Sequence, residues 1–131
     1  MRLRIVVLAV LLSGCGSAAV RQEVRAIHDF IVVSNLKQVD IIRLYSQLNY
    51  SYVNDDFVTI SVSDRNYLVE FSSRCRALSS NIFTTAMVDY RHDASYLRVG
   101  DTIRGCPIDK IFEATPEQLK EIKALGKSQE T

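Results

Sequence analysis

The sequence predicts an α+β domain with an N-terminal helix, an antiparallel sheet of about five strands and a C-terminal helix packed on the sheet. Three observations predict this class. Apolar residues recur at helical spacing from Val20, residues 58–62 alternate between apolar and polar before a turn and a second apolar run, and Thr115 begins an amphipathic segment. A sheet of this size can curl into a small barrel.

The first element is a targeting segment. The chain begins MRLR, and residues 5–12 (IVVLAVLL) are all apolar. Eight helical residues span about 12 Å, well short of the ~20 residues that cross a bilayer. A basic start, a short apolar core and small residues after it are typical of a secretory signal peptide. We therefore expect residues 1–14 to be a signal peptide.

The signal segment ends in Leu12-Ser13-Gly14-Cys15, which resembles the bacterial lipobox. The resemblance implies a diacylglyceryl thioether on Cys15, cleavage before it and acylation of the new amine. Two or three acyl chains anchor stably, because each buried methylene contributes about 0.8 kcal/mol. Gly16, where an aspartate would favour the inner membrane, points to the outer membrane, with the domain facing the periplasm. The alternative is an ordinary signal peptide with a chance cysteine.

The domain is expected over residues 20–126, after a tether at 15–19 and before a tail at 127–131. Five extended residues reach at most about 18 Å, so the tether keeps the domain near the membrane. The first helix is indicated by four apolar residues at helical spacing, and Asn35 is a plausible end for it. These four are Val20, Val24, Ile27 and Ile31. Leu36, Val39 and Ile42 fit either a second helical turn or a strand.

The middle of the chain changes to period two. The clearest prediction is a hairpin of residues 58–62 and 67–71 around the turn 63–66. The other expected strands are residues 44–52 before the turn 54–56, residues 82–88, residues 96–99 with 102–104 around Gly100-Asp101, and residues 108–112.

The C-terminal helix has marked ends. Thr115 can cap it, Pro116 suits its first position, and Gln118 completes a capping box. Leu119, Ile122 and Leu125 form its apolar stripe, and Gly126 ends it.

Three cysteines are present, and lipid on Cys15 leaves Cys75 and Cys106. A pair of cysteines in the oxidising periplasm predicts one disulfide. The alternative is a redox-active pair, since Arg74, Arg76 and Arg104 could lower a thiol pKa. No Cys-x-x-Cys motif supports that alternative.

The composition excludes several classes of function. Of the 16 lysines and arginines, Arg2 and Arg4 lie in the signal segment, which leaves 14 basic against 15 acidic residues. Near-neutral charge without a basic stripe gives no case for a nucleic-acid partner. There is no zinc-ligand spacing, no internal repeat and no second apolar run of membrane length. We expect no metal and no cofactor.

Several stretches resemble a family of small proteobacterial lipoproteins, the domain of unknown function 6491. These stretches are NYLVEFSSRCRAL (66–78), LRVGDTIRGCPIDKIFEATPEQL (97–119) and the looser DFIVVSNLKQVDIIR (29–43) with YSYVNDDFVTI (50–60). The most specific parts are residues 67–69 before Cys75 and residues 101–106 with Ile108 after them. The resemblance implies a lipid-anchored or secreted envelope protein with two cysteines at these places. It implies no activity, cofactor or catalytic residue.

Few residues could serve catalysis. Only His92, Asp93 and Glu70 are plausible acid–base groups, and His92 and Asp93 sit in a polar loop. His28 and Asp29 are adjacent on the first helix and cannot face each other. These side chains are more simply explained as surface groups. Asp101 and Arg104 could form a structural ion pair.

The best candidates for surface recognition are Tyr45, Tyr50 and Tyr52, since tyrosine offers apolar area and a hydroxyl. Tyr50 and Tyr52 share the parity of Leu48, which favours core packing for these two.

The preferred hypothesis is a non-enzymatic, lipid-anchored outer-membrane protein that presents a disulfide-linked domain to an envelope protein, peptide or lipid. The alternatives are a periplasmic enzyme of unknown reaction and a thiol redox protein that uses Cys75 and Cys106.

Overall fold

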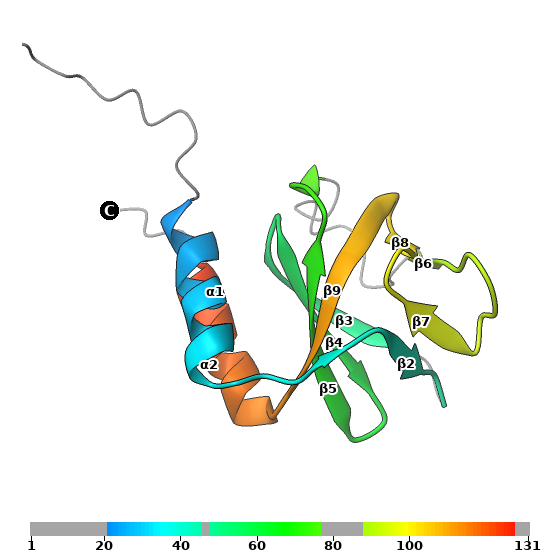
Figure 1. Ribbon diagram of the computed structural model, residues 1–131, viewed down its shortest axis with the longest axis horizontal. Coiled ribbons are helices and arrows are strands. Elements are labelled where there is room, and N and C mark those ends of the chain that lie inside the picture. The colour runs from blue at the N-terminus through cyan, green and yellow to red at the C-terminus, as the bar shows by residue number, and fades with distance from the viewer. Residues whose placement is uncertain (1–20, 46–47, 77–87, 128–131) are drawn as a thin grey trace, which may run out of the picture.

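The computed structural model describes residues 21–45, 48–76 and 88–127 and has three layers (Figure 1). Helices α1 (Gln22–Val33) and α2 (Pro116–Gly126) pack side by side on one face of a curled antiparallel sheet, and a two-stranded sheet covers the other face. The expected α+β class, with a helix at each end of the domain, is confirmed.

The main sheet has seven strands in the order β3-β4-β5-β9-β8-β6, with β1 on β9, and the second sheet pairs β2 with β7. The strands are β1 (Gln38–Val39), β2 (Ile41–Arg43), β3 (Asn49–Asn54), β4 (Phe57–Val62), β5 (Arg65–Phe71), β6 (Val88–Asp89), β7 (Tyr96–Arg98), β8 (Thr102–Ile103) and β9 (Cys106–Ala114). Strand β9 is central, because it pairs with β5, β1 and β8.

Helix α1 ends with a Schellman motif. The Asn35 N–H donates to the carbonyl of Val32, and the Leu36 N–H donates to that of Ile31. Asn35 has a φ of 51°, the left-handed conformation that this motif requires and asparagine tolerates. Leu36 and Ile31 both pack against the core beneath the helices. The expected helix end at Asn35 is therefore confirmed, and the left-handed conformation of Asn35 explains why the helix stops there.

Helix α2 begins with the expected capping box. The Gln118 N–H donates to Thr115 Oγ1 over 3.2 Å, and the Thr115 N–H donates to Gln118 Oε1 over 2.9 Å. Pro116 takes the first helical position, where its missing N–H costs nothing. The helix is set directly after β9, so these caps fix where the sheet ends and the helix starts.

The predicted hairpin is β4 and β5, in register from Phe57↔Glu70 to Val62↔Arg65. Its turn is tighter than expected, because only Ser63 and Asp64 lie outside the strands and Ser63 adopts a φ of 55°. The undecided stretch after Leu36 forms strands β1 and β2. Of the strand expected at residues 82–88, only Val88 lies among the described residues, at the start of β6.

Alternation along the sheet separates two cores. Phe57 of β4, Leu68 of β5 and Phe112 of β9 face the helices and pack against α1 and α2. Their strand neighbours face the second sheet, where Ile42 of β2 and Leu97 of β7 close the other core. The buried residues of the main sheet in that core are Val58, Ile60, Val62, Tyr67, Val69, Phe71, Ile103, Ile108 and Ile111. A one-residue slip of β4 would exchange the two faces, so burial on both sides fixes the register.

Candidate functional site

The two domain cysteines form a disulfide, which confirms the pairing. Their Cα atoms lie 5.8 Å apart, within the usual range of about 4.4–6.8 Å. The bond joins the segment after β5 to the first residue of β9. The Cys75 N–H also donates to the carbonyl of Asp55. This hydrogen bond holds the β3–β4 turn against the segment that follows β5.

The structure separates the expected acid–base groups. His92 and Asp93 are exposed in the loop between β6 and β7. The Ser95 N–H donates to Asp93 Oδ1 over 2.9 Å and holds the pKa of that carboxyl below its ordinary value. Glu70 lies in β5 and contacts His28 of α1, so its side chain is on the helix-covered face of the sheet.

Glu70 instead contacts His28. His28 Nε2 lies 2.7 Å from Glu70 Oε1, and the imidazole meets the Phe57 ring edge-on at 5.6 Å between centroids. Sequence reasoning missed this pair, because 42 residues separate its members. The sequence held one indication of this contact: Glu70 is two residues after Leu68, so both side chains point to the helix-covered face of β5. The pair ties α1 to β5.

Asp101 is a buried structural carboxylate. Its Oδ1 accepts from the Arg91 N–H over 2.9 Å and its Oδ2 from the Arg98 N–H over 2.8 Å. The backbone of Asp101 also pairs with Ile108 of β9. The side chain therefore fixes the loop before β7 and the turn after it to the main sheet.

One cleft, of about 590 Å³, opens where α1 starts, β3 turns into β4 and α2 ends; we name it the N-terminal cleft. Its lining residues are Arg21, Glu23, Tyr52, Val53, Asn54, Asp55, Lys123, Gly126 and Lys127. The acidic side chains and Arg21 at its wall are paired. Tyr52 Oη donates to Asp55 Oδ1 over 2.7 Å, Arg74 Nε donates to Asp55 Oδ2 over 2.9 Å, and Arg21 forms an ion pair with Asp56.

These pairs shift two pKa values in the N-terminal cleft. Burial, followed by the hydrogen bond to Asp55, raises the pKa of Tyr52 to about 12. Burial acts to raise the pKa of Asp55, but the hydrogen bonds from Tyr52 and Arg74 outweigh it and lower that pKa. At neutral pH the phenol is therefore a fixed donor and the carboxylate a fixed acceptor.

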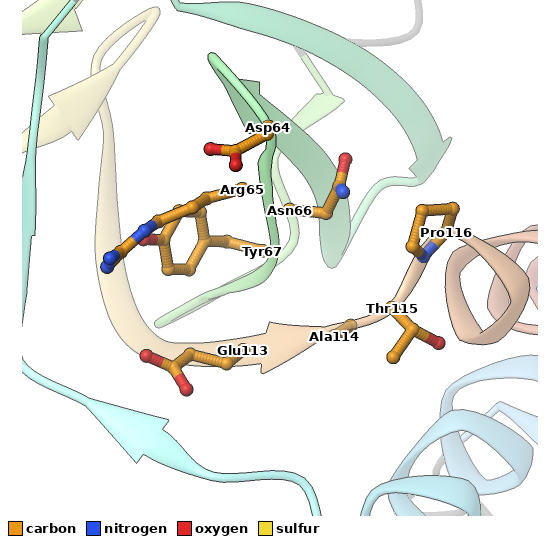
Figure 2. A pocket seen from close by; sticks show the side chains of 8 residues that line it. All are labelled: Asp64, Arg65, Asn66, Tyr67, Glu113, Ala114, Thr115 and Pro116. Carbon is orange, nitrogen blue, oxygen red and sulfur yellow. The ribbon is translucent and has the colours of Figure 1, made fainter.

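A second cleft, of about 500 Å³, lies where the β4–β5 turn, the end of β9 and the start of α2 meet; we name it the turn cleft (Figure 2). Arg65 hydrogen-bonds to Tyr67, which raises the pKa of the guanidinium, with a smaller contribution from Tyr45. Figure 2 shows Arg65 beside the Tyr67 ring, and Glu113 lies on the neighbouring strand β9, where it pairs with Tyr67 in the register. The charged residues that line the cleft are thus one cation, Arg65, and two anions, Asp64 and Glu113.

A third feature is the outer surface of the β2–β7 sheet, which we name the Arg–Tyr face: Ile41, Arg43, Tyr45, Tyr96 and Arg98. The register pairs Ile41 with Arg98 and Arg43 with Tyr96, while Ile42 and Leu97 point into the core. Arg43 Cζ lies 4.7 Å from the centroid of the Tyr45 ring, and Arg98 Cζ lies 5.6 Å from that of Tyr96. Both distances are within cation–π range.

The three candidate tyrosines lie apart. Tyr45, 66% exposed, belongs to the Arg–Tyr face. Tyr50 is half-buried against the core under the second sheet, and Tyr52, 39% exposed, lines the N-terminal cleft. Sequence reasoning missed Arg43 and Arg98 as the companions of the exposed tyrosines. The available signal was spacing, since Arg43-x-Tyr45 and Tyr96-x-Arg98 each place both side chains on one face of an extended segment.

Neither a metal cluster nor a membrane span is found within the described ranges. No group of three or more histidine, cysteine, aspartate or glutamate side chains converges there as metal ligands would. None of the described helices has the length and apolar character of a membrane-spanning helix.

The sequence matches the model of one protein family. That model, a family of unknown function (DUF6491), aligns with residues 1–130, which is nearly the whole chain. No curated protein and no solved structure matches the chain. The family match agrees with the resemblance carried by the stretches around Cys75 and Cys106. The chain therefore belongs to the family of unknown function DUF6491.

Proposed function

We propose that this protein is a non-enzymatic, lipid-anchored envelope protein whose domain binds an acidic segment of another envelope protein through the Arg–Tyr face. Lipid on Cys15 would hold the domain at the outer membrane, facing the periplasm. The lipobox-like Leu12-Ser13-Gly14-Cys15 supports the anchor, and the Cys75–Cys106 disulfide suits an oxidising compartment.

The observation that carries the proposal is the chemistry of the Arg–Tyr face. Its five residues include two arginines, two tyrosines and no carboxylate. Arginine and tyrosine are enriched where protein interfaces gain most of their affinity. A guanidinium can bind a carboxylate through two parallel hydrogen bonds. Because Arg43 and Arg98 already rest on aromatic rings, less side-chain entropy is lost when a partner binds.

The position of the Arg–Tyr face suits this role. The β2–β7 sheet lies on the opposite side of the main sheet from the helices (Figure 1). The expected tether joins the domain at the start of α1, on the helix side. A domain held from that point would present the Arg–Tyr face away from its attachment.

The partner is tested by photo-crosslinking in intact cells. A photoreactive residue replaces Tyr45, and a matched control replaces Leu125, which is exposed on the helix side of the domain. We expect a discrete adduct from position 45 whose crosslinked peptide is acidic, and its loss when Arg43→Glu is added. Identical adducts from both positions, or an adduct that survives Arg43→Glu, would contradict the proposal.

The anchor is tested separately with Cys15→Ser. We expect an unprocessed precursor that no longer incorporates a fatty-acid probe. Normal processing and membrane retention of this variant would overturn the anchor without affecting the crosslinking result.

A further inference from the structure

The side-chain amide of Asn54 has a buried donor without an acceptor. Asn54 is only 6% exposed, and its Oδ1 accepts from the N–H groups of Asp56 and Phe57 over 2.9 and 3.1 Å. These two bonds fix which end of the amide is oxygen, so the NH₂ group points the other way. Within the described part of the chain, Nδ2 has no hydrogen-bond partner. A buried, unpaired donor bears its full desolvation cost and therefore needs an explanation.

The unpaired amide belongs to the N-terminal cleft. Asn54 lines that cleft together with Gly126 at the end of α2. A Cβ at position 126 would overlap Val53 Cγ1 and would lie 3.4 Å from Asn54 Nδ2. Glycine therefore lets the end of α2 approach the β3–β4 turn, and Nδ2 is buried beside that helix end, in a residue that lines the cleft.

The unpaired charge of the cleft is positive. Asp55 is bonded to Tyr52 and Arg74, and Arg21 is paired with Asp56 and Glu23. Lys123 and Lys127 also line the cleft, and neither forms an ion pair with any other described residue. One fixed NH₂ donor with two flexible ammonium groups suits an anion that carries several acceptor oxygens, as a phosphoryl group does.

The position of the cleft indicates the source of that phosphoryl group. Arg21, at the cleft wall, follows Cys15 by six residues, so an extended tether spans at most about 22 Å between them. We propose that the N-terminal cleft binds the phosphoryl group of an anionic phospholipid headgroup, with Asn54 Nδ2 as the central donor and Lys123 and Lys127 as the cations. This inference rests on the lipid anchor proposed above, which would place the cleft at the headgroup layer.

The test follows the side-chain amide signal of Asn54 by NMR in the full chain purified in a maltoside detergent. Phosphatidylglycerol vesicles, phosphatidylcholine vesicles and inorganic phosphate are added in separate titrations. We expect a saturable shift with phosphatidylglycerol at a lower phosphate concentration than with inorganic phosphate, and little shift with phosphatidylcholine. Mass spectrometry of the same preparation reports lipid on Cys15, so failure of the anchor and failure of the cleft are distinguished.

Two variants isolate the cleft. Asn54→Asp keeps the acceptor for the turn but removes the NH₂ donor; vesicle binding, followed on backbone amides, should be lost while the fold is kept. Lys123→Gln and Lys127→Gln should each weaken binding about fivefold, whereas the matched Lys120→Gln, outside this cleft, should not. The proposed site would be wrong if Lys120→Gln weakened binding as much as Lys123→Gln does. It would also be wrong if phosphatidylcholine gave the same response as phosphatidylglycerol.

The titrations also separate the two sources of phosphate. An equal response to inorganic phosphate and phosphatidylglycerol would overturn the headgroup as the ligand, because the site would then take a soluble anion. No response in any titration would overturn the site altogether.

Discussion

The N-terminal cleft and the Arg–Tyr face both carry arginine and tyrosine, yet they use these residues in opposite ways. In the cleft wall, Tyr52 and Arg74 converge on the buried carboxylate of Asp55, so every partner is fixed by a hydrogen bond. On the Arg–Tyr face, Arg43 and Tyr45 meet through a ring and a cation at the surface. The first arrangement stabilises a turn, and the second holds the exposed Arg43 on a ring at the surface.

The largest expected effect on stability comes from removing the Cys75–Cys106 disulfide, which lies beside the β3–β4 turn. Replacing Cys75 and Cys106 together with serine opens a loop of 31 residues, which the chain-entropy model values at about 3–4 kcal/mol. The free energy of unfolding from denaturant titration should fall by that amount. A redox titration is the companion measurement: reduction between about −120 and −270 mV, with thiol-exchange activity, would favour a redox role over a structural one.

The next largest effect comes from removing the carboxylate of Asp55, to which Tyr52 and Arg74 donate hydrogen bonds. Asp55→Asn should cost about 2–3 kcal/mol, because Arg74 and Tyr52 lose the charged acceptor that they share. The folded-state pKa of Asp55 is lowered, so its contribution is present above the unfolded value of about 3.8 and is lost as the pH falls through the folded value. Unfolding of the wild type should therefore depend more steeply on pH below about 4 than unfolding of Asp55→Asn. Equal acid dependence of the two would contradict the network.

A smaller effect concerns the close approach at Gly126. Helix propensity favours alanine over glycine by about 1 kcal/mol, but a Cβ at this position would overlap Val53 Cγ1. Overpacking of this kind costs about 1–3 kcal/mol, so Gly126→Ala should lower the melting temperature. Ala124→Gly, at an exposed position of the same helix, is the control and should reveal the propensity alone. An increase in melting temperature for Gly126→Ala would contradict this prediction, because it would show that Val53 can move to accommodate the added Cβ.

The smallest effect on stability belongs to the Arg–Tyr face. Arg43→Ala should change the free energy of unfolding by no more than about 0.5–1 kcal/mol, because the cation–π contact is exposed. The same variant should abolish the adduct from position 45. The comparison between the two regions would fail if Arg43→Ala destabilised the domain as strongly as Asp55→Asn.

The sequence predicted the elements whose signals are local. The capping box at Thr115, the helix end at Asn35 and the hairpin around Ser63 each depend on neighbouring residues, and all three are present. The disulfide followed from the count of cysteines. Strands β1 and β2 were undecided because two or three residues are too short to show a period of two.

The surfaces were harder to predict, because distant segments build them. The N-terminal cleft joins residues near positions 21, 54 and 126, and the Arg–Tyr face joins β2 to β7. No local pattern specifies such pairings. The tyrosines were chosen by residue type, and only the fold shows that Tyr45 and Tyr52 belong to different surfaces.

The central place of β9 constrains the order in which the protein can be completed. Strand β9 follows every other strand in the chain, yet β5 has no neighbour on its second side until β9 is made. An emerging chain can form the β4–β5 hairpin, but one edge of β5 stays open until β9 is synthesised. The sheet can therefore be completed only once β9 has emerged, and a truncation before Cys106 should leave an aggregation-prone fragment.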